Sequence, residues 1–229
     1  MSGARRAAAE SIIFPLDAPD LETASLWVER LQGGVGLFKI GLELFVAAGP
    51  EAVRRITAES GSGVFLDLKL HDIPSTVERA ARAAARLGVR MLTVHAGRNP
   101  AGLAAAVEGA GGDLSVLAVS RLTSEPASAG EIESLAEIAV SAGCQGLVCA
   151  GSDLEGVRAR IGKVLELVCP GIRPRGAERG DQVRVVTPGE AIARGADYLV
   201  IGRPIRGAPD PRAALRAIVR EIEEVAALS

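Results

Sequence analysis

The amino-acid sequence predicts a single-domain (β/α)8 TIM barrel of the α/β class. Short apolar segments typical of strands alternate with segments whose apolar residues recur at helical spacing. We count eight such strand–helix pairs within 229 residues. Strict alternation requires parallel strands joined by crossover helices, and eight units in a chain of this length fit a closed barrel near its lower size limit.

The expected strands are short apolar segments spread along the whole chain. Pro15 cannot donate a backbone hydrogen bond, so the first strand should end early or carry a bulge. The predicted strands are residues 11–16, 37–40, 64–70, 90–94, 114–119, 145–149, 164–169 and 197–201.

The expected helices follow these strands. A break is expected near Gly49 and Pro50, Pro74 suits a first helical turn, and Ser75 with Glu78 has the spacing of a capping box. Ser152 is expected to cap the sixth helix. The predicted helices are residues 20–31, 42–58, 74–87, 100–109, 131–142, 152–161, 187–194 and 211–227.

The main alternative architecture is a doubly wound open sheet. Such sheets usually have fewer strands and carry a glycine-rich fingerprint after the first strand, where this chain reads LDAPD. No linker or shift in composition divides the chain. We therefore expect one domain over residues 1–229, with residues 1–10 as a loosely ordered N-terminal extension.

Composition excludes several classes of function. The net charge is −2 and aromatic residues make up 3% of the chain, so neither a basic nucleic-acid surface nor a platform for stacking bases is expected. No signal peptide and no apolar run of about 20 residues is present, so no membrane partner is expected. Cys144, Cys149 and Cys169 are typical of reduced core residues in a cytoplasmic protein.

The most informative segment is residues 64–77, VFLDLKLHDIPSTV, where a strand leads into a helix. It contains Asp67, Lys69 and Asp72. Alternate side chains of a strand share a face, so Asp67 and Lys69 should point the same way. Because a buried charge is costly unless it is paired, these residues form either a structural salt bridge or a site built for chemistry.

Polar or special residues stand at the carboxyl ends of most other predicted strands. These residues are Asp17, Lys39, His95, Ser124, Pro170, Gly202 and Arg203. Functional residues of barrels come from several strand ends on this face, so the convergence favours a functional site. Three of these residues have alternative interpretations. Asp17 could cap the following helix, Lys39 could extend its ammonium group into solvent, and His95 could be a core residue.

A phosphate site is expected after the last strand. Loops at this position on barrels often bind phosphate through backbone N–H groups, and Arg203 can form two hydrogen bonds with a phosphate group. The loop 171–186 carries Arg173 and Gln182 and is long for a compact fold. Its length favours a lid that closes over a ligand.

Seven motifs together support a resemblance to a known family. They are KIG at 39–41, DLKLHDIPSTV from Asp67, VHAG from Val94, LTS from Leu122, PGIRP from Pro170, GDQVRVVTP from Gly180 and IGRPI from Ile201. With these motifs the chain resembles the orotidine 5′-phosphate decarboxylase family from about Ile13 to Ile205. The Asp-x-Lys-x-x-Asp pattern alone also occurs in related sugar-phosphate decarboxylases.

The resemblance implies roles for individual residues. Lys39, Asp67, Lys69 and Asp72 match the family's alternating catalytic charges, and Asp72 would complete the site of a partner subunit, which implies a homodimer. The implied substrate-binding residues are Asp17, Ile73, Thr76, Thr123, Ser124, Pro170, Arg173, Gln182, Gly202 and Arg203. Arg121 stands beside the LTS motif, where the family is more apolar.

The resemblance also implies an activity. The substrate would be orotidine 5′-monophosphate (OMP), converted to UMP and CO2 in pyrimidine biosynthesis, with Lys69 donating a proton to C6 and with neither metal nor cofactor. Two alternatives remain open. One is a metal-dependent sugar-phosphate decarboxylase of the 3-keto-L-gulonate 6-phosphate type, and the other is a barrel that binds phosphoribosyl ligands without catalysis.

Overall fold

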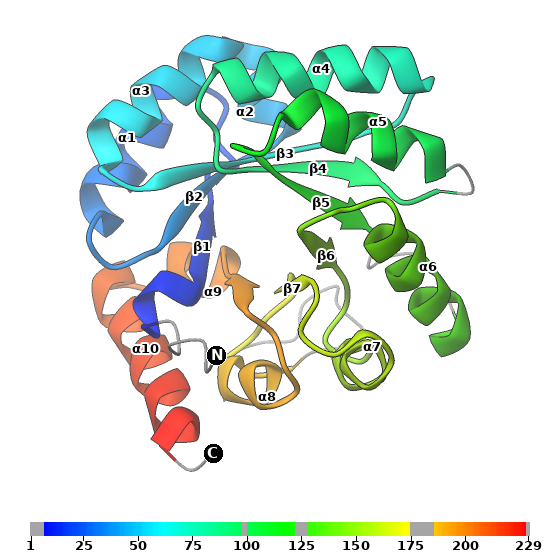
Figure 1. Ribbon diagram of the computed structural model, residues 1–229. Coiled ribbons are helices and arrows are strands. Elements are labelled where there is room, and N and C mark those ends of the chain that lie inside the picture. Colours follow the sequence, from blue (N-terminus) through cyan, green and yellow to red (C-terminus); the bar gives the residue numbers. More distant parts are fainter. Residues whose placement is uncertain (1–6, 98–99, 122–127, 175–185, 228–229) are drawn as a thin grey trace.

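The computed structural model describes residues 7–97, 100–121, 128–174 and 186–227. Its strands form a closed parallel barrel in the order β1 to β8, with helices around the outside (Figure 1). The predicted (β/α)8 barrel is therefore confirmed. The strands are β1 (Ile12–Pro15), β2 (Leu37–Ile40), β3 (Gly63–Leu70), β4 (Met91–His95), β5 (Ser115–Val119), β6 (Gly146–Val148), β7 (Glu166–Cys169) and β8 (Tyr198–Val200).

The helices also follow the predicted order, with one addition. The break at Gly49 separates α2 from α3, and a four-residue helix, α9, follows β8 without having been predicted. The helices are α1 (Leu21–Leu31), α2 (Leu42–Ala48), α3 (Pro50–Ser60), α4 (Pro74–Arg86), α5 (Pro100–Ala110), α6 (Ala129–Ser141), α7 (Leu154–Ile161), α8 (Pro188–Ala193), α9 (Arg203–Arg206) and α10 (Pro211–Ala227). A short 3-10 helix, η1 (Ala9–Ser11), precedes β1 and lies partly within the predicted N-terminal extension.

Two of the predicted helix caps are wrong. Pro74 is the first residue of α4, as predicted, but this makes Ser75 the second helical residue and not the cap, and no side chain caps this helix. The α7 helix begins after Asp153, and the Ser152 hydroxyl donates to the Asp153 carboxylate instead of capping the helix.

Asp20, and not Asp17, caps α1. Its side-chain oxygen accepts a hydrogen bond of 2.8 Å from the backbone N–H of Thr23, as N-cap aspartates do. Asp17 lies three positions earlier, between the end of β1 and the helix. The capping interpretation of Asp17 is therefore excluded, and its carboxylate is left for the site at the barrel mouth.

The barrel interior is filled by one apolar cluster. It consists of Ile13, Leu37, Phe65, Met91, Leu117, Val168 and Tyr198, and a larger cluster packs the outside of the barrel against the helices. Side chains two residues apart on a strand share a face. The inward-facing positions that follow Leu37, Phe65 and Met91 are Lys39, Asp67 and Thr93, so a polar layer lies above the apolar one at the carboxyl ends of β2, β3 and β4.

The amino end of the barrel is held by Arg158 on α7. Its guanidinium donates to the backbone oxygens of Gly162, Leu165 and Gly195, at 3.0, 2.8 and 2.8 Å, and pairs with Asp197. These groups lie just before β7 and β8. Arg158 therefore joins α7 to both strand entries, at the end of the barrel where stability, not catalysis, is usually encoded.

All three cysteines are buried and unpaired, as predicted. Burial raises the pKa of the Cys144 thiol to about 12. Within the ranges that the structure describes, no helix combines the length and apolar character needed to cross a membrane.

Candidate active site

Lys39 lies between two aspartates at the carboxyl ends of adjacent strands. Its register partners are Pro15 on β1 and Phe65 on β3, and Asp17 and Asp67 stand two residues further along the chain on either side. The Lys39 Nζ atom is 3.2 Å from Asp67 Oδ2 and 3.7 Å from Asp17 Oδ1. Only 12% of the Lys39 side chain is exposed, so its ammonium is paired inside the barrel mouth and does not extend into solvent.

Asp67 is the buried centre of this cluster. Both of its carboxylate oxygens lie 2.8 Å from Lys69 Nζ, and Oδ1 also accepts a hydrogen bond of 2.9 Å from the Thr93 hydroxyl. Burial alone would raise the pKa of Asp67, but the charges of Lys39 and Lys69 and the hydrogen bonds from Lys69 and Thr93 outweigh it, and the pKa lies below its ordinary value. Asp67 is therefore held as an anion between two cations.

Lys69 reaches Asp67 through an irregularity in β3. From Leu66 to Leu70 the strand advances four residues, whereas β4 advances two, from Leu92 to Val94. Within this bulge Lys69 has a φ of 49°. The predicted meeting of Asp67 and Lys69 is confirmed, but a left-handed residue in a bulge brings it about, and not regular alternation along the strand.

Asp72 is not brought into this cluster within one chain. It is exposed, its Oδ1 accepts a hydrogen bond of 2.6 Å from the Ile73 N–H, and no ion pair to it is found in the described part of the chain. The Ile73 side chain is 63% exposed, and the Thr76 hydroxyl is 3.5 Å from Arg79 Nη2. These three predicted residues stand together at the start of α4, beside the charge cluster in sequence but outside it in space.

Gly202 and Arg203 lie directly after β8, next to the end of β1. A Cβ atom on Gly202 would approach Pro15 Cγ to 2.6 Å, so the close contact between the two segments requires glycine here. Arg203 is exposed at the first position of α9. The two predicted phosphate residues therefore stand on the same side of the barrel as Asp17.

Arg206 anchors α9 to the end of β1. Its guanidinium donates to the backbone oxygens of Pro15 and Asp17, both at 2.7 Å, and lies 5.6 Å from the ring centroids of Phe14 and Trp27. Sequence reasoning missed this residue, because nothing local distinguishes it from other arginines. It couples the turn that carries Arg203 to the segment that carries Asp17.

The remaining predicted residues follow β5 and β7. Pro170 comes directly after β7. Arg173 is buried, and its backbone N–H donates to the backbone oxygen of Val186 at 3.1 Å. This hydrogen bond joins the two ends of the predicted lid loop. Arg121 pairs with Glu131 in the first turn of α6. Thr123, Ser124 and Gln182 lie outside the described residues.

The two histidines lie next to each other, His71 directly after β3 and His95 at the end of β4. The ring centroids of His71 and His95 are 5.5 Å apart and the rings are tilted. His95 is half-buried, whereas His71 is exposed. The strand pattern singles out His95 alone, and the neighbour of His95 in space is the other histidine of the chain.

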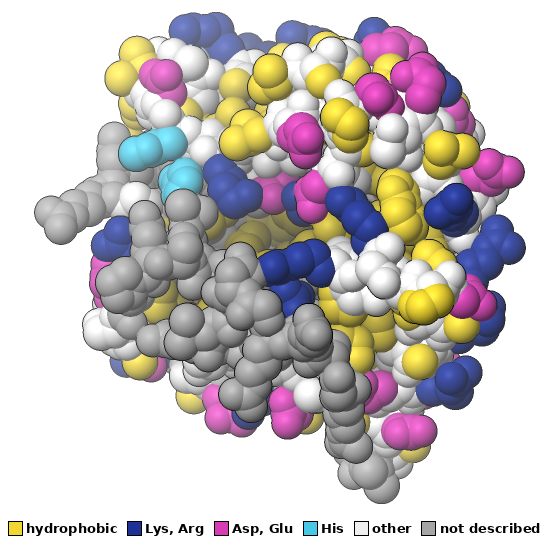
Figure 2. Space-filling model, turned by 180° about the vertical axis from the view of Figure 1, so that it is seen from behind, with side chains coloured by type: hydrophobic (Ala, Val, Ile, Leu, Met, Phe, Trp, Pro, Cys, Tyr) yellow, Lys and Arg dark blue, Asp and Glu magenta, His cyan; other side chains and the backbone are white. Residues whose placement is uncertain are grey.

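The face of the molecule shown in Figure 2 is hollowed near its centre. Basic and acidic side chains lie side by side at the edge of the hollow, above apolar side chains. The arrangement matches a polar layer over an apolar barrel interior. A cluster of this kind can bind an anionic ligand and stabilise charge that develops beside an ammonium group.

Residues 10–218 match the family described as "Orotidine 5′-phosphate decarboxylase / HUMPS family". The chain belongs to this family. The resemblance drawn from the seven motifs is thereby confirmed at the level of the family.

Individual relatives agree with this assignment. A protein of Anaeromyxobacter sp. (strain K) named orotidine 5′-phosphate decarboxylase is 50% identical over 220 residues, covering 91% of this chain and 96% of its own. One of the same name from Moorella thermoacetica is 47% identical, covering 96% and 95%. Among solved structures, the orotidine 5′-phosphate decarboxylase of Lactobacillus acidophilus superposes with a TM-score of 0.80 at 33% identity, covering 92% of this chain and 98% of that one.

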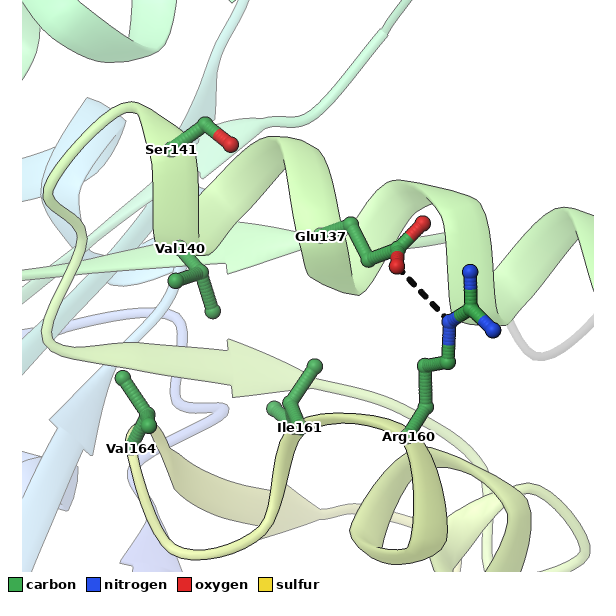
Figure 3. Close-up of a pocket in the computed structure, with 6 residues that line it drawn as sticks. All are labelled: Glu137, Val140, Ser141, Arg160, Ile161 and Val164. Carbon is green, nitrogen blue, oxygen red and sulfur yellow. Dashed lines mark hydrogen bonds and ion pairs between the residues drawn. The ribbon is translucent and has the colours of Figure 1, made fainter.

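The pocket in Figure 3 is separate from this family site. It has a volume of about 280 Å³ and lies between α6 and α7, where Val140, Ile161 and Val164 stand beside the ion pair of Glu137 and Arg160. Val164 precedes β7, so the pocket opens near the amino ends of the strands. It therefore lies towards the opposite end of the barrel from Lys39 and Asp67.

Thr93 is a site residue that sequence reasoning missed. It is fully buried on β4, and its hydroxyl contacts both Asp67 and the backbone of Lys69. The available signal was a single hydroxyl in the otherwise apolar segment MLTV, at the inward position of a strand next to the charged one.

Proposed function

We propose that this protein is an orotidine 5′-phosphate decarboxylase that converts OMP to UMP and CO2 in pyrimidine biosynthesis. The observation that carries the proposal is the line of alternating charges Asp17, Lys39, Asp67 and Lys69 at the carboxyl ends of β1, β2 and β3. Relatives named orotidine 5′-phosphate decarboxylase that are 50% identical over 220 residues support it.

The chemistry explains why such charges are needed. Loss of CO2 from C6 of the pyrimidine leaves a carbanion without an electron sink in the ring. Lys69 is 31% exposed and paired to Asp67, so its ammonium is held in place while its proton remains accessible. We assign Lys69 as the proton donor to C6, with its charge stabilising the carbanion as it forms.

Asp67 and Lys39 complete the arrangement. Asp67 holds both lysine side chains in place through ion pairs. Its carboxylate would repel the carboxylate of the substrate, and this repulsion would be relieved when CO2 leaves. Lys39 and Asp17 would contact the ribose hydroxyl groups. Each of these roles uses a group whose position is already set by ion pairs with its neighbours.

Binding of the rest of the substrate is assigned to the strand ends further round the barrel. The phosphate would be bound by Arg203, Gln182 and the Gly202 backbone. The pyrimidine would be bound by Thr123 and Ser124. Pro170 and Arg173 stand where the lid loop begins. Phosphate binding would close this loop and use remote binding energy for the chemical step.

A homodimer would complete each site. Asp72, Ile73 and Thr76 lie together outside the cluster of their own chain, where they can contribute to a partner's site. Leu42, Val46 and Ile73 are apolar, between 56% and 81% exposed, and follow the ends of β2 and β3. Burial of this surface against a second copy would account for its apolar character.

The reaction is proposed to need neither metal nor cofactor. Three buried, unpaired cysteines support a reducing compartment, the cytoplasm.

The test is to follow the absorbance of OMP with purified protein, with and without EDTA. We expect OMP to be consumed at equal rates in both, with one UMP formed for each OMP lost.

Two results would contradict the proposal. Activity that EDTA abolishes, together with no binding of pyrimidine nucleotides, would favour the metal-dependent sugar-phosphate decarboxylase. Binding of UMP without any loss of OMP would favour a non-catalytic ligand-binding barrel.

A further inference from the structure

Thr93 occupies the polar layer of the barrel next to Asp67. It is two residues after Met91, which packs in the barrel interior, so its side chain points inward at the carboxyl end of β4. No part of Thr93 is exposed. A buried hydroxyl requires hydrogen-bond partners, and those of Thr93 are both in β3.

The Thr93 hydroxyl uses its donor and one acceptor position at once. It donates to Asp67 Oδ1 at 2.9 Å and accepts from the backbone N–H of Lys69, also at 2.9 Å. The two hydrogen bonds therefore form a chain. The Lys69 N–H donates to Thr93 Oγ1, and the Thr93 O–H donates to the Asp67 carboxylate. Bonds arranged in this way polarise one another, and the charge on Asp67 strengthens both.

The bond to the Lys69 N–H replaces one that the sheet does not supply. Between Leu66 and Leu70 the register of β3 against β4 is interrupted, so a side chain on β4, and not a backbone oxygen, receives this N–H. Lys69 has a φ of 49° and is the only described residue other than glycine with a positive φ. Such a conformation is unfavourable for a lysine and persists only where surrounding contacts hold it.

We propose that Thr93 is a positioning residue for the decarboxylation step, which holds Lys69 in its left-handed conformation and Asp67 in register beneath it. The inference rests on the proposed function for its kinetic consequence. Its structural part, the dependence of the Lys69 backbone on the Thr93 hydroxyl, stands without it.

Two variants separate the hydroxyl from the volume of the side chain. Thr93→Val replaces the hydroxyl by a methyl group of similar size, leaves the Lys69 N–H without an acceptor and removes one donor from Asp67. Thr93→Ser keeps the hydroxyl and loses the methyl group. Ser11→Ala is the matched control, because Ser11 is also a buried hydroxyl, donates to the Ala8 oxygen at 2.7 Å and lies at the amino end of β1.

The measurements are kcat with OMP, Kd for UMP, and amide hydrogen exchange at Lys69 by NMR. In Thr93→Val we expect kcat to fall about 10- to 100-fold, because a displaced proton donor costs rate, while the Kd for UMP changes little. Exchange at the Lys69 amide should accelerate at least about tenfold, because its acceptor is gone. Thr93→Ser should restore both kcat and protection, and Ser11→Ala should change neither.

The outcomes separate this inference from the proposed function. A wild-type protein that leaves OMP intact contradicts the proposed function, and Lys69 exchange in Thr93→Val then decides the structural part alone. Unchanged exchange in Thr93→Val overturns the inference, whatever happens to kcat. If the wild type is active, unchanged kcat in Thr93→Val, or equal loss in Thr93→Ser and Thr93→Val, overturns it as well.

Discussion

At the scale of single residues, Asp67 determines the character of the site. The sequence predicted its pairing with Lys69, because residues two apart on a strand share a face. Neither the φ of Lys69 nor the contact from Thr93 could be predicted, since both depend on how β3 pairs with β4, and no local pattern in residues 64–70 encodes that register. The charged residues Asp67 and Lys69 could be predicted from the sequence of β3 itself. Their hydrogen-bond partner Thr93 lies on the next strand, β4.

The lowered pKa of Asp67 predicts a loss of stability in acid. A carboxyl group whose pKa is lower in the folded protein contributes stability above its unfolded pKa, and this contribution is lost as the pH falls through the folded pKa. The difference in unfolding free energy between wild type and Asp67→Asn should therefore be largest near neutral pH and shrink below about pH 4. Urea denaturation at several pH values measures it.

Asp113→Asn is the control for this experiment. Asp113 is exposed, so its substitution should change the unfolding free energy little. A difference between wild type and Asp67→Asn that grows on acidification would contradict the assignment of Asp67 as a buried anion.

Lys69→Ala tests the proposed proton donor. Turnover of OMP should fall by at least about 1,000-fold, because both proton donation and the stabilising charge are removed. Affinity for UMP should be largely kept, because the proposed phosphate-binding residues Arg203 and Gly202 are untouched. Lys163→Ala removes an exposed lysine outside the site and serves as the control; turnover of Lys69→Ala close to that of this control would exclude the assigned role.

At the scale of elements, the positions of helices and strands were predicted well and their ends less well. Pro74 correctly marked the start of α4, but the same proline displaced the expected capping box, because the helix begins one residue before Ser75. The α9 helix was missed, since four residues are too short to show helical periodicity. What holds α9 in place is a long-range contact, the bonding of Arg206 to β1.

The contacts of α7 predict unequal effects for two neighbouring arginines. Arg158→Ala removes hydrogen bonds to three backbone oxygens and the ion pair with Asp197, and should lower stability by about 2 kcal/mol. In a chain of this size that corresponds to a Tm lower by about 4–8 °C. Arg160→Ala breaks only an exposed pair with Glu137 and should change the Tm by about 1 °C or less.

Scanning calorimetry distinguishes these two variants. An equal effect of both would contradict the view that Arg158 fastens the entries of β7 and β8. Turnover at 25 °C should be the same in both folded variants, because α7 packs at the end of the barrel away from the charge cluster.

At the scale of the whole molecule, the barrel could be predicted because its signal is repeated. Eight strand–helix pairs supply the same evidence, so an error at one helix end does not change the architecture. The fold then brought together Asp17, Lys39 and Asp67 from the carboxyl ends of three successive strands. Asp72 could not be placed in this way, because in the single chain it is exposed and lies outside the cluster.

Mixed dimers test the contribution of Asp72. Asp72→Ala and Lys69→Ala should each be inactive alone. In a hybrid, one site contains Lys69 and the partner's Asp72 intact, so mixing equal amounts with subunit exchange should restore about a quarter of wild-type activity. Absence of recovery in dimers shown to have exchanged subunits would contradict a site shared between protomers.

The closure of the barrel through β1 and β8 has a consequence for the synthesis and folding of the polypeptide on the ribosome. β1 pairs with β8 through Ile12 and Ile13. The first strand of the barrel to leave the ribosome therefore has one uncovered edge until the last strand has been made. Nascent chains that stop after β7 and before β8 expose two open edges, on β1 and β7, each able to pair with another polypeptide. Premature termination should therefore yield aggregates and not smaller folded proteins, and chaperone capture of the nascent chain should persist until β8 is made.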